Sequence, residues 1–286
     1  MKRNPIRVDI ILCCYSQEQY IAKAVESVLA QDTEGLECRL IVADDCSPDS
    51  TLEIIRSYEQ GAEMPFVYLK AESNIGFHAN YKRAFEACGN ADFVAILEGD
   101  DFWHSSDHLK QNVGFLLGHR RFSMSFNNIR VYSTAEDKYS ASHWPYPKPF
   151  WHISLKQQIT GNRIGNLSAC VFRGNLIREI PREFFSLNFS DWELGMFMAQ
   201  YGPIAILKES TSTYCVNGKG EWTKLDKEQK NLSLERTLNE AEAFFRGKYS
   251  NHFTLARRLL EEGKDLPPYM SLKSRVKKML KTLFNK

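Results

Sequence analysis

Three carboxylates directly follow a predicted buried strand in the first half of the chain. The strand is the continuous apolar run Phe93–Leu97, a pattern typical of a strand buried on both faces. Glu98, Asp100 and Asp101 come next, around Gly99, which allows a sharp turn and close approach of the backbone. Clustered carboxylates repel one another, and Mg²⁺ or Mn²⁺ binds one or two carboxylates together with substrate phosphates. The cluster therefore predicts a metal site, with a solvated acidic turn or a helix N-cap as the alternative.

Polar segments also follow three other predicted strands, at residues 8–14, 38–43 and 66–69. An amphipathic helix is expected after each strand, and strands alternating with helices indicate βαβ units and a parallel sheet. Ligands of such sheets bind beyond the carboxyl ends of the strands. The polar segments at those ends are Tyr15, Asp44-Asp45, Asn74-Ile75-Gly76 and the Glu98–Asp101 turn. The pattern predicts one site along one edge of the sheet.

The same edge excludes several common nucleotide-binding and hydrolytic sites. Residues 14–18 contain no glycine, so the G-x-G-x-x-G turn of a dinucleotide oxidoreductase is absent. Gly218-Lys219 lacks the spacing and the hydroxyl residue of a P-loop, and no G-x-S-x-G nucleophile elbow occurs. A carboxylate-lined edge suited to a metal-bound, phosphate-bearing ligand is what remains.

Length and composition indicate a soluble globular protein. The 286 residues suggest one large domain, alone or with an appendage, and the apolar and charged fractions of 43% and 25% are ordinary. No apolar run reaches 18 residues, so no membrane-spanning helix is expected, and a net charge of +2 gives no reason to expect a nucleic-acid partner. The seven cysteines show no C-x-x-C spacing, which favours structural thiols of a cytosolic protein.

Three segments at the start of the chain resemble family 2 glycosyltransferases: residues 14–21, 27–31 and 41–51. Asn74-Ile75-Gly76 and Leu97–Trp103 continue the match in order and at the expected spacing. The resemblance implies an inverting, nucleotide-sugar-dependent enzyme with the α/β GT-A fold, a Rossmann-like, mostly parallel sheet flanked by helices. It implies a domain over residues 1–222, with a nucleotide-sugar half to about residue 120 and an acceptor half over 121–222.

The resemblance also implies roles for the residues that bind the nucleotide. Tyr15 matches the residue whose ring lies beside the base, and Asp45 matches the acceptor of the base imide N–H. Asp44 is expected to support that turn, and Asn74 to lie on the nucleotide side. Packing for Tyr15 and helix capping for the Asp pair are the alternatives.

Asp100 and Asp101 match the region that holds the divalent metal, Mg²⁺ or Mn²⁺, that bridges the diphosphate, and Asp100 also matches a ribose contact. Glu98 replaces the more frequent first Asp, and we expect it to contact the ribose or to support the metal ligands. Such a metal is a Lewis acid that neutralises the charge developing on the departing nucleoside diphosphate.

The expected catalytic base lies in Ser190–Leu194, at the start of a predicted helix. Asp191 before Trp192 matches the base that takes the proton of the acceptor hydroxyl in a single inverting displacement. A capping role for Asp191 is the alternative, with Glu193 as the other candidate base. Trp192 and Glu193 are also expected near the acceptor, and residues 161–168, which lead into a strand, match the family's acceptor-side loop.

Tyr214–Trp222 resembles the family's mobile loop over the donor, with two departures. Cys215 stands for the usual Arg and Asn217 for the usual His, which removes a His contribution to the metal or diphosphate. Asn217 and Lys219 can still reach phosphate oxygens, Lys219 as a point charge.

The tail changes character after two helical patterns in an extension over residues 223–268. Residues 269–286 combine an apolar stripe with six basic residues and no acid, which favours a helix lying on an anionic membrane surface. A helix docked on the protein with a solvated basic face is the alternative.

Together these features predict a metal-dependent inverting glycosyltransferase on the cytoplasmic face of the cell membrane. The donor is a nucleoside-diphosphate sugar, with a UDP-sugar favoured. The acceptor is a hydroxyl of a glycan or lipid-linked glycan in cell-surface polysaccharide biosynthesis. A sugar-1-phosphate nucleotidyltransferase and a non-catalytic, membrane-associated scaffold are the alternatives.

Overall fold

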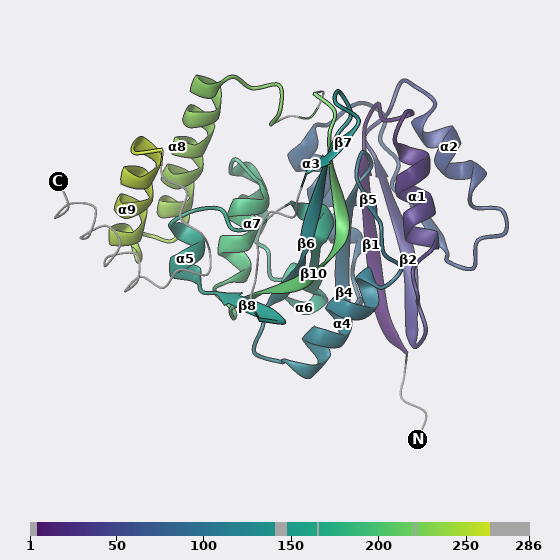
Figure 1. Ribbon diagram of the computed structural model, residues 1–286, viewed down its shortest axis with the longest axis horizontal. Helices are drawn as coiled ribbons and strands as arrows, with labels where there is room; N and C mark the ends of the chain where they lie inside the picture. The colour runs from purple at the N-terminus through teal and green to yellow at the C-terminus, as the bar shows by residue number, and fades with distance from the viewer. Residues whose placement is uncertain (1–4, 141–147, 165, 219, 221, 264–286) are drawn as a thin grey trace.

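A mixed ten-stranded sheet with helices on both faces forms the centre of the protein (Figure 1). The computed structural model describes residues 5–140, 148–164, 166–218, 220 and 222–263. The strand order is β3-β2-β1-β4-β9-β6-β10-β5, with β7 paired to β6 and β8 paired to β10. The strands are β1 (Ile6–Cys14), β2 (Leu36–Asp44), β3 (Phe66–Tyr68), β4 (Phe93–Glu98), β5 (Phe102–Trp103), β6 (Met124–Ser133), β7 (Lys138–Ser140), β8 (Phe150–Ile153), β9 (Cys170–Arg173) and β10 (Ile204–Val216).

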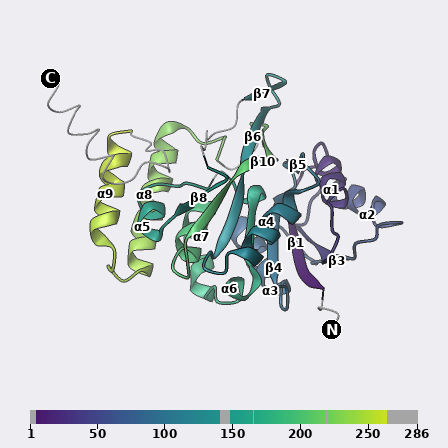
Figure 2. The ribbon, with the colours of Figure 1, turned by 60° about the horizontal axis from the view of Figure 1, so that its bottom comes forward.

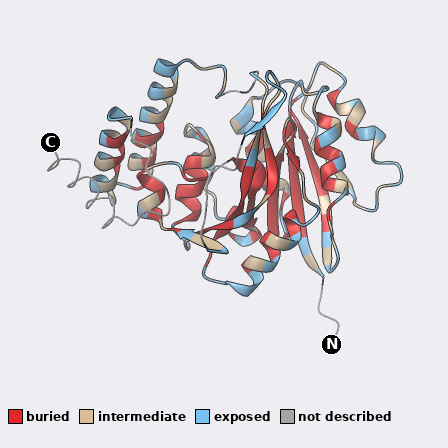
Figure 3. Ribbon diagram, viewed as in Figure 1, coloured by how far each residue is buried: buried red, intermediate tan, exposed pale blue. Residues whose placement is uncertain are grey.

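Two buried layers of side chains, one on each face of the sheet, explain why the central strands are continuously apolar. Helices α1, α2 and α4 contribute to one layer, and α3 and α5–α9 to the other (Figure 3). The helices are α1 (Ile21–Leu29), α2 (Thr51–Ser57), α3 (Phe77–Ala87), α4 (His108–Gly118), α5 (Leu155–Ile159), α6 (Gly174–Ile177), α7 (Asp191–Met198), α8 (Lys227–Phe244) and α9 (Ser250–Glu261), with the 3₁₀ turns η1 (Leu167–Ala169) and η2 (Arg182–Ser186).

The predicted α/β fold with alternating strands and helices is confirmed, and the parallel part of the sheet is concentrated in the first half of the chain. Strands β3, β2, β1 and β4 are mutually parallel. The second half mixes directions, because β9 runs antiparallel to both β4 and β6 while β6 and β10 are parallel. Sequence reasoning did not identify β10 as a strand: Ile204–Leu207 were left unassigned, and Tyr214–Val216, expected to begin a mobile loop, are the end of this strand.

The two helical patterns predicted after residue 226 correspond to α8 and α9. These helices lie side by side at the far side of the molecule from α1 and α2 (Figure 2). Phe244 of α8 packs against Phe184 and Phe197, with ring centroids 5.8 and 6.3 Å apart. Among the described helices, none has the length and apolarity needed to cross a bilayer. The predicted membrane-surface helix, residues 269–286, lies outside the described residues.

Candidate active site

The parallel register of β1, β2 and β4 brings the predicted polar segments to one edge of the sheet. Cys14 at the end of β1 pairs with Asp44 at the end of β2, and Cys13 pairs with Glu98 at the end of β4. The residues that follow, Tyr15 and Asp45, therefore continue from the same edge. The Tyr15 ring is 45% exposed, so it offers an accessible aromatic face there.

Each acid of the Asp44-Asp45 pair holds a different turn. Asp44 accepts hydrogen bonds from the backbone N–H (3.1 Å) and hydroxyl (2.5 Å) of Ser47, so it fixes the turn that follows β2. Asp45 accepts the backbone N–H groups of Ile75 and Gly76 at 2.9 and 2.8 Å. The Asp45 carboxylate thereby anchors the 74–76 turn, whose first residue, Asn74, is exposed.

Asp101 is buried and is hydrogen-bonded to two other segments of the chain. Its carboxylate, 1% exposed, accepts hydrogen bonds from Asn166 Nδ2 (2.5 Å) and Ser168 Oγ (2.6 Å) at one oxygen and from Cys215 N (2.8 Å) at the other. These donors come from the turn before β9 and from β10, so Asp101 ties the acidic turn to both segments. Both oxygens of Asp101 are thus engaged inside the protein, and its expected role as a metal ligand stays a prediction.

Gly99 is required by packing rather than by its backbone conformation. The φ angle of Gly99 lies outside the left-handed region. A Cβ at this position would lie 2.3 Å from Gln17 Oε1, 2.8 Å from Ile21 Cδ1 and 2.9 Å from Cys14 Cβ. The acidic turn therefore lies directly on the start of α1 and the end of β1.

Glu98 and Asp100 are the acids of the turn that are only half-buried. Burial, reinforced by the charges of Asp100 and Asp191, raises the pKa of Glu98 to about 8, and the Tyr81 hydroxyl lies 3.4 Å from its carboxylate. Burial also raises the pKa of Asp100, which accepts a hydrogen bond from Asn217 Nδ2 at 2.8 Å. Two hard oxygen donors that disfavour each other's charge fit a divalent cation.

Glu98 and Asp100 are too few ligands to hold a metal ion without further oxygens from water or substrate. Within the described residues, no group of three or more His, Cys, Asp or Glu side chains is arranged to hold a metal ion. A two-carboxylate site of this kind suits a cation such as Mg²⁺, which keeps waters and takes further oxygens from substrate phosphates.

Ser190, rather than Asp191, caps helix α7. The Ser190 hydroxyl accepts the Trp192 N–H at 3.1 Å, while Asp191 is the first helical residue and is half-buried. Burial raises the pKa of Asp191 to about 6, and a hydrogen bond from the Asn162 side chain opposes that shift. The charge of Asp191 contributes in turn to the raised pKa of Glu98, although the two residues are 93 positions apart in sequence.

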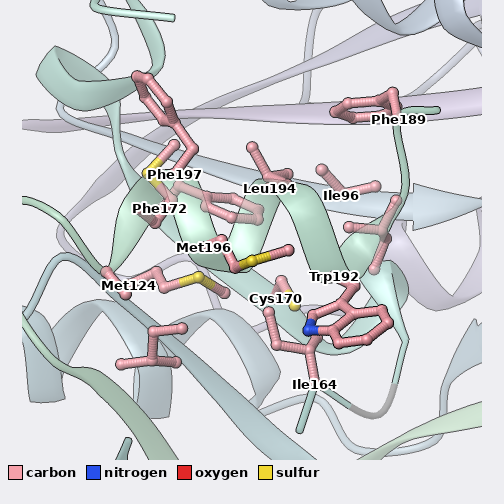
Figure 4. Close-up of a cluster of buried hydrophobic side chains, with 14 of the residues drawn as sticks. Ile96, Met124, Ile164, Cys170, Phe172, Phe189, Trp192, Leu194, Met196 and Phe197 are labelled. Atoms are coloured by element: carbon pink, nitrogen blue, oxygen red, sulfur yellow. The ribbon is translucent and has the colours of Figure 1, made fainter. Parts of the chain in front are cut away.

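Trp192 and Glu193 do not reach the open side of this site. The Trp192 indole N–H donates to the Gln158 carbonyl at 2.6 Å, and its ring lies among Ile164, Cys170 and other buried side chains (Figure 4). Glu193 is 1% exposed and accepts a hydrogen bond from the Ser190 hydroxyl; burial raises its pKa to about 7. Helix α7 turns both side chains into the core, and their expected position near the acceptor stays a prediction.

The segment after β10 connects to the acidic turn through Asn217. Its Nδ2 donates to Asp100, while its Oδ1 accepts the Gly220 N–H at 3.2 Å. Gly218 has a left-handed φ of 72°, which favours glycine at this turn. Lys219, expected near the donor phosphates, lies outside the described residues.

Sequence reasoning identified the 161–168 loop only as a unit and missed its individual contacts. Ser168 receives the Glu98 N–H at 3.1 Å and donates to Asp101, so it supports the acidic turn from both sides. The Asn162 side-chain oxygen accepts the backbone N–H of Ile164 at 3.2 Å. Each is a small polar residue close to glycine, a signal too common in loops to assign a role without the fold.

Comparison with known proteins places these features in a family. The sequence profile described as Glycosyl transferase family 2 matches residues 9–180. An uncharacterized protein of Mycobacterium tuberculosis (strain H37Rv) is 31% identical over 217 residues, which cover 75% of this chain but 60% of that protein. A putative teichuronic acid biosynthesis glycosyltransferase of Bacillus subtilis is 35% identical over 125 residues, covering 43% of this chain and 47% of that one.

Two solved structures share the fold at low sequence identity. The Staphylococcus aureus TarS 1–349 complex with UDP-GlcNAc has a TM-score of 0.58 at 18% identity, covering 88% of this chain and 81% of that chain. A mannosyltransferase from Pyrobaculum calidifontis in complex with GDP-Man and Mn²⁺ has a TM-score of 0.57 at 13% identity, covering 97% and 79%.

Proposed function

The chain belongs to glycosyl transferase family 2, and from this premise we propose that it transfers a sugar from a nucleoside-diphosphate donor to a hydroxyl acceptor with inversion. The observation that carries the proposal is that the charge of Asp191 acts on Glu98, which ends β4 two residues before Asp100. Two half-buried acids suited to a cation lie in one site with a third carboxylate whose pKa is about 6. An inverting transfer needs one carboxylate that takes the proton of the acceptor hydroxyl, with no covalent intermediate.

We assign the metal to Glu98 and Asp100, with Asp101 as the residue that fixes their turn. A divalent cation bound there supplies electrostatic stabilisation of the leaving diphosphate. This assignment modifies the expectation from sequence, in which Asp101 was a metal ligand. It is supported by the Mn²⁺ in the mannosyltransferase with the same fold, and by the half-buried positions of the two acids.

Asp191 is the proposed catalytic base. Its carboxylate takes the proton of the acceptor hydroxyl, the acceptor oxygen forms a bond to the anomeric carbon, and the bond from that carbon to the diphosphate oxygen breaks on the opposite face. A pKa of about 6 keeps the carboxylate ionised at neutral pH yet basic enough to hold the proton. Glu193 is a poorer candidate, because its side chain is enclosed.

The proposed nucleotide contacts are the exposed Tyr15 ring, for stacking on the base, and Asp45, for its N–H donor. Asp45 can serve both its turn and a base, since each carboxylate oxygen accepts more than one hydrogen bond. We favour a UDP-sugar as donor, in keeping with the UDP-GlcNAc bound by the structurally similar TarS.

The proposed acceptor is a glycan or lipid-linked glycan of the cell surface. Relatives named for such roles include the putative teichuronic acid biosynthesis glycosyltransferase and a poly(ribitol-phosphate) β-N-acetylglucosaminyltransferase, which is 27% identical over 114 residues. We retain the proposal that residues 269–286 bind an anionic membrane surface, which would place the enzyme near a lipid-linked acceptor.

Turnover of a panel of UDP-, GDP- and dTDP-sugars, with and without Mn²⁺, tests the proposal. We expect Mn²⁺-dependent release of nucleoside diphosphate from one donor class, and no transfer to acceptor by Asp191→Asn, which keeps the size of the side chain. Release of pyrophosphate from a sugar 1-phosphate and a nucleoside triphosphate would indicate the nucleotidyltransferase instead. A protein that neither turns over nor binds any nucleotide would instead be the non-catalytic scaffold.

A further inference from the structure

We propose that helix α8 positions the catalytic base, because Glu240 on α8 and Asn188 together hold the turn that leads to Asp191. Helix α8 lies beyond the residues matched by the family profile, 9–180, and the sequence predicts it only as part of a C-terminal extension. Asn188 lies between η2 and α7, three positions before Asp191. The inference rests on the proposed function, since it takes Asp191 as the base.

Four hydrogen bonds join Asn188 to α8. Its backbone N–H donates to Glu240 Oε2. Its side-chain NH₂ group donates to the Ser233 carbonyl at 3.3 Å, to Ser233 Oγ at 3.1 Å and to Thr237 Oγ1 at 3.0 Å. The three α8 residues are spaced by four and three positions, so they lie on one face of the helix. One residue of the turn is therefore held along two turns of α8.

The Glu240 carboxylate is fixed on its own helix. Its Oε1 accepts a hydrogen bond from Arg236 Nε at 2.6 Å, one turn earlier in α8. Its other oxygen is the one that accepts the Asn188 N–H. A hydrogen bond to an ionised acceptor is shorter and stronger than one between neutral groups. Glu240 thus joins the backbone of the turn to the helix by a charge-assisted bond.

Helix α8 is itself anchored to the rest of the protein. Leu238 on its inner side is fully buried. The Phe244 ring contacts Phe197, which belongs to α7, the helix that begins at the proposed base. On the other side, Arg257 of α9 binds the Glu242 carboxylate at 2.6 Å. The helix that holds Asn188 is therefore fixed relative to both α7 and α9.

The chain between Asn188 and Asp191 is also fixed by its own contacts. Phe189 is 2% exposed, and its ring centroid lies 5.4 Å from that of Tyr81 on α3. Ser190 follows and caps α7 by accepting the Trp192 N–H. Because neither residue can rotate freely, a displacement of Asn188 is expected to reach Asp191.

The turn also contacts the donor side of the site. The Phe189 ring lies 5.9 Å from Phe77, the first residue of α3, which follows Gly76 and its hydrogen bond to Asp45. The base segment therefore lies between the helix that starts at the nucleotide turn and α8. In a single displacement the acceptor oxygen must lie between the base and the anomeric carbon, and a shift of about 1 Å can cost roughly a hundredfold in rate.

Replacement of Glu240 tests the proposal. Glu240→Ala removes the acceptor of the Asn188 N–H, whereas Glu240→Gln keeps an oxygen there. For UDP-GlcNAc, or whichever donor in the panel is accepted, we expect Glu240→Ala to lower kcat roughly tenfold to a hundredfold, with KM within about twofold. Glu240→Gln should restore most of this loss. The exposed Glu235 of the same helix is the matched control, and Glu235→Ala should leave both constants unchanged.

Asn188→Ala gives a second measurement, because it removes the three side-chain bonds and keeps the backbone bond. We expect a loss of kcat in the same range. The losses of Asn188→Ala and Glu240→Ala should be less than multiplicative in the double variant, since each releases the same turn. Fully multiplicative losses would show that the two residues act separately and would contradict the proposal.

The ¹H–¹⁵N signal of the Trp192 indole reports the start of α7 without turnover. Trp192→Phe identifies the signal, which should shift in Glu240→Ala and stay in place in Glu235→Ala. A Glu240→Ala protein with the kcat and the Trp192 signal of the wild type overturns the proposal. A fall in kcat with an equal loss of UDP affinity would indicate general damage and would also contradict it. Absence of turnover in the wild type would refute the proposed function, and the Trp192 signal would still decide whether α8 holds the turn.

Discussion

The structure predicts opposite consequences for two adjacent acids, Asp101 and Asp100. Asp101→Asn keeps an oxygen for Asn166 and Ser168 but places an NH₂ group against the Cys215 N–H. A buried donor left without an acceptor costs about 1–3 kcal/mol of folding free energy.

The neighbouring charges reduce that cost. Burial and the carboxylates of Asp100 and Glu98 raise the pKa of Asp101, so removing its charge relieves repulsion. We therefore expect a loss in the lower half of the range, about 1–2 kcal/mol, which lowers Tm by about 2–8 °C for a protein of this size. Urea unfolding and thermal melting of metal-free protein measure it.

Asp100→Asn is the matched control. Its carboxylate is half-buried and makes one described contact, from Asn217, so its loss should leave stability close to that of the wild type. Calorimetric titration with UDP and Mn²⁺ should then show loss of Mn²⁺-dependent binding in Asp100→Asn and retention in Asp101→Asn. The reverse pattern, with Asp101→Asn fully stable but unable to bind Mn²⁺, would refute this assignment and place the metal at Asp101.

Three further predictions concern the acidic turn and the tail. Because the pKa of Glu98 is raised to about 8, unfolded protein loses that proton at lower pH than folded protein, so metal-free stability should fall between about pH 5 and pH 8. Glu98→Gln should flatten this dependence in urea unfolding measured across that range, and an unchanged slope would assign it to other groups. Gly99→Ala should cost about 1–3 kcal/mol, because its Cβ would overlap Gln17, Ile21 and Cys14, and a urea midpoint equal to that of the wild type would show that the turn can shift. Deletion of residues 269–286 should move the protein from sedimenting anionic vesicles to the supernatant while leaving donor hydrolysis intact, and unchanged sedimentation would exclude the tail as the anchor.

The seven cysteines bear on handling of the protein in these experiments. All seven lie in the described part of the chain, and each is a free thiol. Cys46 is exposed, and the other six thiols are buried. Burial raises the pKa of these thiols, for example that of Cys38 to about 11. The structure thus agrees with the expectation of structural thiols, and a reductant should not alter the fold.

The sequence by itself determined the order of the strands and helices in the first half of the chain and the edge that carries the site. Apolar runs such as Phe93–Leu97 need burial on both faces, and alternating helices leave a parallel sheet as the arrangement that provides it. Parallel strands end at one edge, so the position of Tyr15, Asp45 and Glu98 on that edge followed from the order alone.

The tertiary structure decided which of the neighbouring side chains in each motif are buried and which are accessible. The sequence does not distinguish Asp100 from Asp101. Asp101 turns inward because its hydrogen-bond donors, Asn166 and Cys215, lie 65 and 114 positions later in the chain. Trp192 is buried for a similar reason, since its N–H meets the carbonyl of Gln158, 34 positions earlier. Local patterns indicate the burial that a segment needs, whereas the positions of Asp101 and Trp192 depend on contacts between segments that only the folded chain brings together.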